Sequence, residues 1–218
     1  MPTLRLETEA GGIVCGIDEA GRGPLAGPVV AAAVIIDTTK LKRRLARAID
    51  DSKELTRGER EALYPEIRAC AMVGVGAAST IEIDRINILR ATLLAMARAV
   101  TALGVRPDLA LVDGNVPPTL PCPVRTVVGG DGISLSIAAA SIIAKVTRDL
   151  LMTRLAQRYP GFGWEHNAGY STREHFGALA RFGVTPHHRR SFEPVIQHLE
   201  NCGEFNPQLV AQTRTLGE

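Results

Sequence analysis

Four carboxylates stand where strand-like apolar runs of this sequence meet glycine-rich breaks, and together they could hold divalent metal ions. Asp18 and Glu19 follow one apolar run and precede a segment rich in glycine and proline. Asp113 ends a second run, and Asp131 follows a third run and two glycines. Charged side chains at the ends of buried strands occupy positions where functional residues concentrate. These four side chains are therefore candidates for a catalytic site.

Converging carboxylates repel one another and lose solvent, which raises their pKa values unless cations neutralise them. Hard divalent cations such as Mg²⁺ prefer oxygen ligands, and Mg²⁺ needs only one or two protein carboxylates besides water and substrate oxygens. Two such ions roughly 3.5–4 Å apart suit in-line hydrolysis of a phosphodiester. One interpretation is therefore a two-metal nuclease site; the alternative is a set of unrelated surface acids.

Asp18 and Glu19 are neighbours, and neighbouring strand residues point to opposite faces of a sheet. We expect both to serve one site only if the strand ends or is distorted there, which the glycines that follow would permit. The alternative for this pair is a solvated acidic turn.

The segment Gly21-Arg22-Gly23 lacks the lysine and the spacing of a nucleotide-binding P-loop, and it is not a dinucleotide fingerprint. Its glycines would let the backbone approach a ligand closely, and its guanidinium suits a phosphate. Lys53, after Asp51 and Ser52, is predicted as a second phosphate contact, with an exposed helix-cap lysine as the alternative.

Tyr170 is flanked by a glycine and two hydroxyl residues inside a basic window of the chain. That window, residues 141–190, holds eight Lys/Arg against three Asp/Glu, a net charge of +5 that suits a polyanion surface. An exposed Tyr170 could stack on a base or a sugar. A tyrosine that fills the core is the equal alternative.

Composition and cysteine usage limit the remaining possibilities. At 45% hydrophobic and 22% charged residues, the chain has the composition of an ordinary globular protein. The cysteines and histidines do not show the spacing of a zinc site, and no signal peptide opens the chain. The longest uncharged runs have 13 residues, fewer than the ~18–20 of a membrane span. We expect a soluble, cytoplasmic protein without membrane contact.

The apolar pattern predicts an α/β fold, a mixed β-sheet flanked by helices. Strands are expected at 12–18, 28–36, 70–78, 109–112 and 124–128. Helices are expected at 40–50, 80–86, 88–104, 133–158 and 172–182. A further helix is expected to begin at a capping box formed by Thr56 and Glu59. Residues 1–11 and 160–169 are expected to be irregular. We predict a single domain, 1–218, with a core at about 12–160, a helical, basic C-terminal extension at about 161–199 and a frayed tail at about 200–218.

Seven segments resemble, in order, the signature motifs of type 2 ribonucleases H, the ribonuclease HII family. They are GIDEAGRGPLAGP (16–28), DSK (51–53), IDRIN (83–87), LVDGN (111–115), GD (130–131), AAASIIAKVTRD (138–149) and GYSTREH (169–175). The resemblance spans about residues 13–195. Two positions depart from it, since Gly129 and Ser171 stand where the family commonly has lysine and proline or glycine.

The resemblance implies a ribonuclease H-like sheet with Asp18, Glu19, Asp113 and Asp131 as the catalytic, metal-binding set. It further implies that Gly21-Arg22-Gly23 reads the 2′-hydroxyl of a ribonucleotide, and that Tyr170 stacks against the deoxyribose on its 3′ side. In the motif at 138–149, we predict further substrate contacts by Ser141, Lys145 and Arg148.

The implied function is an endoribonuclease that cuts RNA in RNA–DNA hybrids and single ribonucleotides in duplex DNA. It would cut 5′ to the ribonucleotide with two Mg²⁺ or Mn²⁺ ions, as a monomer, and leave a 3′-hydroxyl and a 5′-phosphate. Two alternatives stay open: a hybrid-binding module without catalysis, which would need no divalent ion, and another nuclease or recombinase, which would cut all-DNA duplex equally well.

Overall fold

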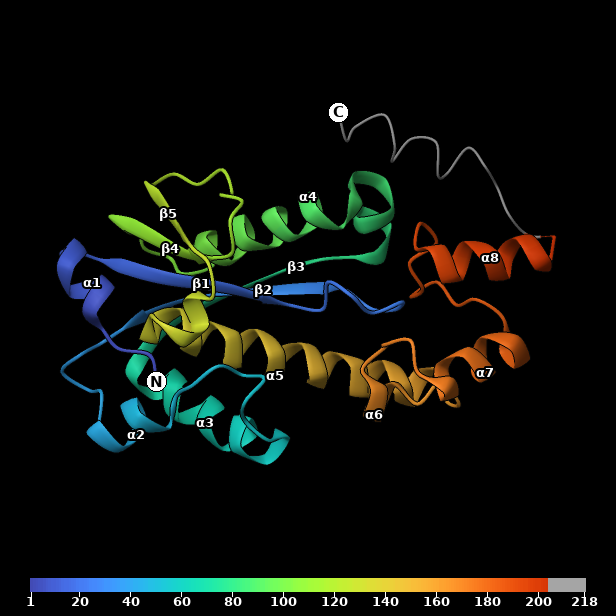
Figure 1. Ribbon diagram of the computed structural model, residues 1–218, viewed down its shortest axis with the longest axis horizontal. Helices are drawn as coiled ribbons and strands as arrows, with labels where there is room; N and C mark the ends of the chain where they lie inside the picture. Colours follow the sequence, from blue (N-terminus) through green and yellow to red (C-terminus); the bar gives the residue numbers. More distant parts are fainter. Residues whose placement is uncertain (204–218) are drawn as a thin grey trace. The chain divides into compact units, whose positions relative to one another are not determined.

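The computed structural model describes residues 1–203, which divide into two compact units (Figure 1). Unit 1 comprises Met1–Ala20, Val30–Ala77 and Leu93–Thr147, and unit 2 comprises Gly21–Val29, Ala78–Thr92 and the chain from Arg148 onward. Residues 204–218, most of the predicted frayed tail, lie outside the described residues. The single domain stays a prediction.

A five-stranded mixed sheet forms the centre of unit 1, in the order β3-β2-β1-β4-β5. Strand β1 pairs antiparallel with β2 and parallel with β4, and β4 pairs parallel with β5. The five strands predicted from apolar runs are all present: β1 (Val14–Ala20), β2 (Val29–Ile36), β3 (Ala71–Ala78), β4 (Leu109–Asp113) and β5 (Val124–Val127). The prediction of a mixed α/β sheet is therefore confirmed.

Helices cover both faces of this sheet (Figure 1). On one face, α2 (Arg43–Ala48), α3 (Arg57–Cys70) and the first part of α5 (Leu135–Arg158) pack on β2 in a core that includes Ala32, Val34, Leu45, Leu63 and Ile143. On the other face lies the second part of α4 (Thr80–Thr101). It packs directly on β3, because a Cβ added at Gly74 or Gly76 would overlap the α4 backbone. Burial of these apolar faces drives the packing.

Two predicted local signals are present. The side chain of Thr56 accepts from the backbone N–H of Glu59, and the Glu59 carboxylate accepts from Thr56, so a capping box begins α3. The predicted boundary between helices 80–86 and 88–104 falls at Asn87, which has φ +66° inside α4. The Asn87 Oδ1 atom accepts from the backbone N–H of Arg90 at 3.0 Å and thereby caps the second segment.

Unit 2 is mainly helical, as predicted for the C-terminal portion. It contains α6 (Trp164–Asn167), α7 (Arg173–Phe182) and α8 (Glu193–Asn201), packed with Leu25, Met152, Phe162, Leu179 and Val195. The same core holds two buried histidines, His175 and His188, whose Nε2 atoms lie 3.0 Å apart. Burial, followed by the charge of His175, lowers the pKa of His188 to about 3.

Three local expectations differ from the structure. Residues 1–11 are not irregular, because Arg5–Ala10 form α1, and Glu7 in this helix accepts hydrogen bonds from Ser134 and Ser136. Within the expected loop 160–169, α6 forms a short helix. Strand β1 does not end at 18, because it pairs with β2 as far as Ala20. Among the described residues, no helix is long and apolar enough to cross a membrane.

Candidate metal centre

The strand register brings three of the four predicted carboxylates together. In the parallel pair of β1 and β4, Ile17 lies opposite Val112, so that Asp18 and Asp113 follow side by side. Asp113 in turn lies opposite Val127 of β5, and Asp131 follows in a short 3₁₀ helix, Gly130–Gly132. Because β1, β4 and β5 are parallel, their carboxyl ends meet at one edge of the sheet.

One oxygen atom from each of Asp18, Asp113 and Asp131 lies within 4.8 Å of the other two. We call these three residues the carboxylate cluster. Asp18 and Asp131 are each only 5% exposed, and Asp113 is half-buried. Such a set of close, partly desolvated oxygen ligands matches the preference of a hard divalent cation. All three cluster members belong to unit 1.

Short hydrogen bonds fix the carboxylates in place. Asp113 Oδ1 accepts from the backbone N–H of Gly130 at 2.7 Å, which ties the end of β4 to the turn that carries Asp131. Asp18 Oδ1 accepts from the backbone N–H of Glu19, also at 2.7 Å. Gly129, at the start of this turn, has φ +64°, a left-handed conformation that favours glycine.

The electrostatics of the cluster favour the binding of a cation. Burial raises the pKa of Asp18 well above its ordinary value, and the charges of Glu19 and Asp113 raise it further. Burial likewise raises the pKa of Asp113, with a further contribution from the charge of Asp131. Divalent cations would remove this repulsion by neutralising the cluster. On these grounds the donor set fits Mg²⁺ or Mn²⁺.

Glu19 lies next to the cluster without belonging to it. Since β1 continues regularly through this position, the Glu19 side chain alternates with that of Asp18 rather than sharing its direction. The strand is thus neither ended nor distorted at Asp18, which was the condition for both carboxylates to serve one site. The Glu19 charge still raises the pKa of Asp18, which shows that the two carboxylates are close enough to interact.

Lys53 supplies a positive charge to this edge of the sheet. Its Nζ atom lies 3.1 Å from Asp131 Oδ2, although the side chain is 76% exposed. Burial lowers the pKa of Lys53, but the hydrogen bond to Asp131 and the charges of Asp131, Asp51 and Asp18 outweigh this effect and raise it. Lys53 is thus an ion-pair partner of the cluster rather than a free helix cap.

Two of the three further substrate contacts predicted in the motif at 138–149 lie in the same unit. Ser141 is buried and donates to Ser52 Oγ at 2.6 Å. Lys145 is half-buried, one helical turn farther along α5. Ser52 escaped the sequence analysis as a site residue, although the motif at 51–53 contains it. Its contact with Ser141 spans 89 positions in the sequence, a separation that spacing alone cannot connect.

Unit 2 contains the predicted substrate-reading loop, residues 21–28, which we call the GRG loop. Gly21 has φ +95°, and a Cβ added there would overlap Arg148 Nε. A Cβ at Gly23 would lie 3.6 Å from the ring of Tyr170, which places this ring against the loop. Tyr170 is 44% exposed, so the alternative of a core-filling tyrosine is wrong.

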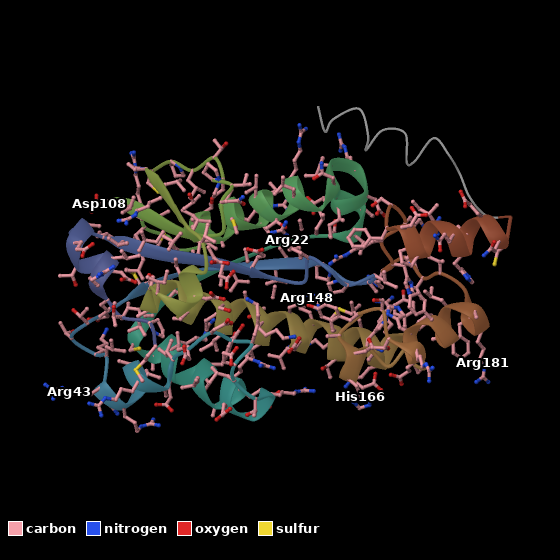
Figure 2. All side chains as sticks on the ribbon, in the orientation of Figure 1. Arg22, Arg43, Asp108, Arg148, His166 and Arg181 are labelled. Carbon is pink, nitrogen blue, oxygen red and sulfur yellow. The ribbon has the colours of Figure 1, made fainter. Side chains whose placement is uncertain are left out.

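Arg148, labelled in Figure 2, lies on α5 and forms hydrogen bonds with other residues of unit 2. Its guanidinium donates to the backbone carbonyls of Ala26, Pro28 and Ala168 and is 1% exposed. This placement favours a role inside the protein over the predicted contact with substrate. A second buried arginine, Arg189, contacts the same loop and was not predicted.

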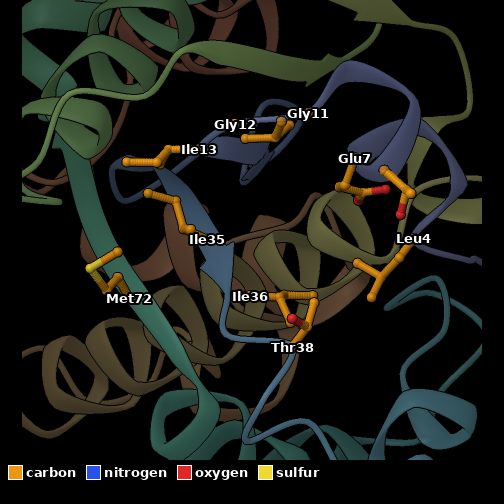
Figure 3. A pocket seen from close by; sticks show the side chains of 11 residues that line it. Leu4, Glu7, Gly11, Gly12, Ile13, Ile35, Ile36, Thr38 and Met72 are labelled. Carbon is orange, nitrogen blue, oxygen red and sulfur yellow. The ribbon is translucent and has the colours of Figure 1, made fainter.

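A cavity of about 340 Å³ lies elsewhere in unit 1 (Figure 3). Apolar residues such as Leu4, Ile35 and Met72 line it, together with Glu7 of α1. It adjoins Val14, the first residue of β1, whereas Asp18 lies toward the other end of that strand. None of the predicted site residues lines this cavity.

The chain resembles known ribonucleases in sequence. The sequence profile of the family described as Ribonuclease HII matches residues 15–195. A Ribonuclease HII of Paramagnetospirillum magneticum is 65% identical over 199 residues, which cover 91% of this chain and 99% of that protein. The match to the family profile at 15–195 thus includes the carboxylate cluster, the GRG loop and Tyr170.

Solved structures of other proteins resemble this chain in fold. The ribonuclease H2 of Pyrococcus horikoshii OT3 superposes with a TM-score of 0.73 at 31% identity, covering 88% of this chain and 99% of that one. Bst-RNase HIII in complex with Mn²⁺ superposes with a TM-score of 0.75 at 19% identity, over 94% of this chain and 75% of that one. At 19% identity the second likeness concerns the fold alone. The predicted ribonuclease H-like sheet with a helical C-terminal portion is confirmed.

Proposed function

Since this chain belongs to the ribonuclease HII family, it is a ribonuclease H hydrolase, and we propose which bond it cuts and how. Its substrate is the RNA strand of an RNA–DNA hybrid or a single ribonucleotide within duplex DNA. It cuts on the 5′ side of the ribonucleotide and leaves a 3′-hydroxyl and a 5′-phosphate. The observation that carries this proposal is the convergence of Asp18, Asp113 and Asp131 within 4.8 Å.

In this proposal, Asp18 and Asp113 hold the divalent ions and Asp131 completes the set of ligands, while Glu19 adds negative charge beside them. A pair of Mg²⁺ or Mn²⁺ ions supplies an activated water and neutralises charge on the leaving oxygen when bound. Lys53 forms an ion pair with Asp131. An exposed ammonium beside the carboxylates also offers a contact for a substrate phosphate.

The cut itself follows from these roles. An oxygen of water forms a bond to the phosphorus atom as the bond from phosphorus to the upstream O3′ atom breaks. The released O3′ atom takes up a proton and becomes the 3′-hydroxyl, and the phosphate stays on the 5′ side of the ribonucleotide. The carboxylate cluster would fix the position of the bound ions in this step, because its oxygens are held by backbone hydrogen bonds such as that from Gly130 to Asp113.

Specificity for RNA requires a contact with the 2′-hydroxyl, the group that distinguishes a ribonucleotide from a deoxyribonucleotide. We assign this contact to Gly21-Arg22-Gly23, where Arg22 and Gly23 are exposed. Tyr170, exposed and packed against Gly23, stacks on the next deoxyribose. Ser141 and Lys145 act as further contacts near the cut.

A cleavage assay tests this proposal. Duplex DNA with one ribonucleotide is incubated with the protein while Mg²⁺ or Mn²⁺ is titrated, beside an all-DNA duplex of the same sequence. We expect cleavage of the first duplex alone, only with a divalent ion, and none by Asp18→Asn although that variant still binds the duplex. Turnover by Asp18→Asn would contradict the proposed role of Asp18 in the metal site. Cutting of the all-DNA duplex would favour the alternative of a nuclease or recombinase without specificity for RNA.

The same assay tests the alternative of a hybrid-binding module, since such a module would bind without cutting.

The wider proposal is that the protein acts in the cytoplasm, as a monomer, in ribonucleotide excision repair and in removal of RNA primers. Gel filtration of the purified protein checks the monomer, and ribonucleotide content of genomic DNA in a deletion strain checks the role in repair.

A further inference from the structure

The carbonyl groups of the GRG loop turn inward toward two buried arginines, a feature that the proposed mechanism does not use. Backbone carbonyls buried away from water need hydrogen-bond donors, and the GRG loop has main-chain bonds as well, such as that from Gly27 N–H to His187 O. Here, five of the eight residues in the loop have their carbonyl oxygen bound by an arginine side chain: Gly21, Arg22, Ala26, Gly27 and Pro28. Both arginines and the whole loop belong to unit 2.

Arg189 spans the two ends of the loop. Its Nε atom donates to Gly27 O at 3.0 Å, one terminal nitrogen donates to Arg22 O at 2.8 Å, and the other donates to Gly21 O. The side chain is 0% exposed, and its guanidinium lies 5.0 Å from the centre of the Phe192 ring. All three donor nitrogens of the guanidinium are therefore bound to one loop.

Arg148 holds the loop from the other side. Its Nε atom donates to Pro28 O at 3.0 Å and a terminal nitrogen donates to Ala26 O at 3.1 Å. The remaining terminal nitrogen donates to Ala168 O at 2.9 Å, two residues before Tyr170. Arg148 thus links the GRG loop to the segment that carries the exposed tyrosine.

These contacts explain why Gly21 is a glycine. A Cβ added there would overlap the Nε, Cδ and Cζ atoms of Arg148, and φ at this position is +95°. The loop backbone at Gly21 is therefore in direct contact with the Arg148 side chain. Burial lowers the pKa of Arg189 to about 9, with a further contribution from the charge of Arg148. Burying these two cations close together therefore costs the folded protein free energy.

We propose that Arg189 and Arg148 are positioning residues that hold the GRG loop ready to read the 2′-hydroxyl of a ribonucleotide. The inference rests on the proposed function, which assigns that reading to Gly21-Arg22-Gly23. Neither arginine touches the substrate. Each acts through the backbone, since a guanidinium fixed by three carbonyls sets where the loop lies before substrate arrives.

Arginine is required because its planar fork presents donors in several directions at once. A lysine keeps the positive charge, but one ammonium cannot reach the carbonyls of Gly21, Arg22 and Gly27 together. Arg189→Lys and Arg148→Lys therefore loosen the loop while preserving charge. Arg190→Lys is a matched control, because Arg190 is the next residue and its side chain is exposed.

The test measures binding to a duplex with one ribonucleotide and to an all-DNA duplex of the same sequence. Every protein also carries Asp18→Asn so that the substrate stays intact. We expect the parent to bind the ribonucleotide duplex about tenfold more tightly, the value of one well-made hydrogen bond. In Arg189→Lys and Arg148→Lys this ratio should fall to about twofold or less, with binding to all-DNA duplex unchanged and Arg190→Lys like the parent.

A general loss of structure would weaken both duplexes alike, so the ratio separates positioning from folding. A parent ratio near one would contradict the proposed function itself. A clear parent ratio that survives in the folded lysine variants would overturn the positioning role alone. Failure of both lysine variants to fold, seen by circular dichroism, would also overturn it by assigning the arginines to the fold.

Discussion

Asp18 is the residue whose environment departs most from that of a free carboxylate. Its folded-state pKa is raised by burial and by two neighbouring carboxylates, whereas the unfolded chain has the ordinary value near 3.8. Stability from this group is therefore present below that ordinary value and is lost as pH rises through the raised pKa. Without metal, the ionised cluster costs the folded protein stability at neutral pH.

Asp18→Asn should accordingly raise the melting temperature of metal-free protein at pH 8, because it removes one of the repelling charges. Mg²⁺ should stabilise the native protein but not this variant. Thermal melts in EDTA and in excess Mg²⁺ measure both effects, with Glu9→Gln, an exposed acid on α1, as the control. An Asp18→Asn variant that is no more stable in EDTA and is still stabilised by Mg²⁺ would contradict this account of the cluster.

Lys53 lends itself to a second residue-scale prediction. Lys53→Met removes the cation beside Asp131 and should tighten Mg²⁺ binding by about two- to fivefold, as expected for an exposed ion pair. The same variant should raise KM for the ribonucleotide duplex, because it also loses a phosphate contact. Calorimetry and steady-state kinetics check the two effects, and Lys40→Met serves as control. Weaker Mg²⁺ binding would show that Lys53 supports the metal site instead.

Elements with a strong apolar pattern could be predicted from the sequence, because a buried strand needs an apolar run. All five strands are predicted from such runs, and the capping box is predicted from the spacing of Thr56 and Glu59. Helix α1 was not, because its six residues, RLETEA, are too short and polar to show a helical period. A distant contact stabilises it, from Glu7 to Ser134 across 127 positions.

The candidate site shows the same division between local and distant information. The carboxylates stand at the ends of apolar runs, so their positions were visible in the sequence. The role of Arg189 was not, because a basic residue in a basic window usually faces solvent. Its acceptors are backbone carbonyls about 160 positions away, which no side-chain pattern reports.

Glycines in β3 provide an element-scale prediction. Gly74→Ala should destabilise the protein by about 1–3 kcal/mol, because the added Cβ would overlap Ala99 O in α4 and force the helix from the sheet. Gly58→Ala in α3 meets nothing within 4 Å and should be neutral or stabilising. Urea unfolding of both variants measures the difference. Equal stability would mean that α4 does not pack directly on β3.

For the whole molecule, the buried groups predict how stability depends on pH. His188 stays neutral in the folded protein because its pKa is lowered to about 3, whereas the unfolded chain takes up a proton near pH 6.5. The contribution of neutral His188 to the free energy of unfolding is thus complete above pH 6.5 and is lost as pH falls toward 3. His175, in contact with His188, is shifted in the same direction by burial.

The free energy of unfolding should therefore fall below pH 6.5, by up to about 1.4 kcal/mol per pH unit from His188. His188→Gln should flatten this slope between pH 6.5 and 4.5 even if it lowers stability overall. His166→Gln, which changes an exposed histidine, should leave the slope as it is. An unchanged slope in His188→Gln would mean that other groups govern the acid side.

The central claim is that Asp18 and Asp113, from two strands, hold the same divalent ions. Calorimetric titration with Mn²⁺ of the native protein, Asp18→Asn, Asp113→Asn and the double variant tests it most directly. We predict that each single variant loses most of the binding and that the double variant loses little more, since both side chains serve one site. Native-like Mn²⁺ binding by Asp113→Asn, or losses that simply add, would contradict the claim.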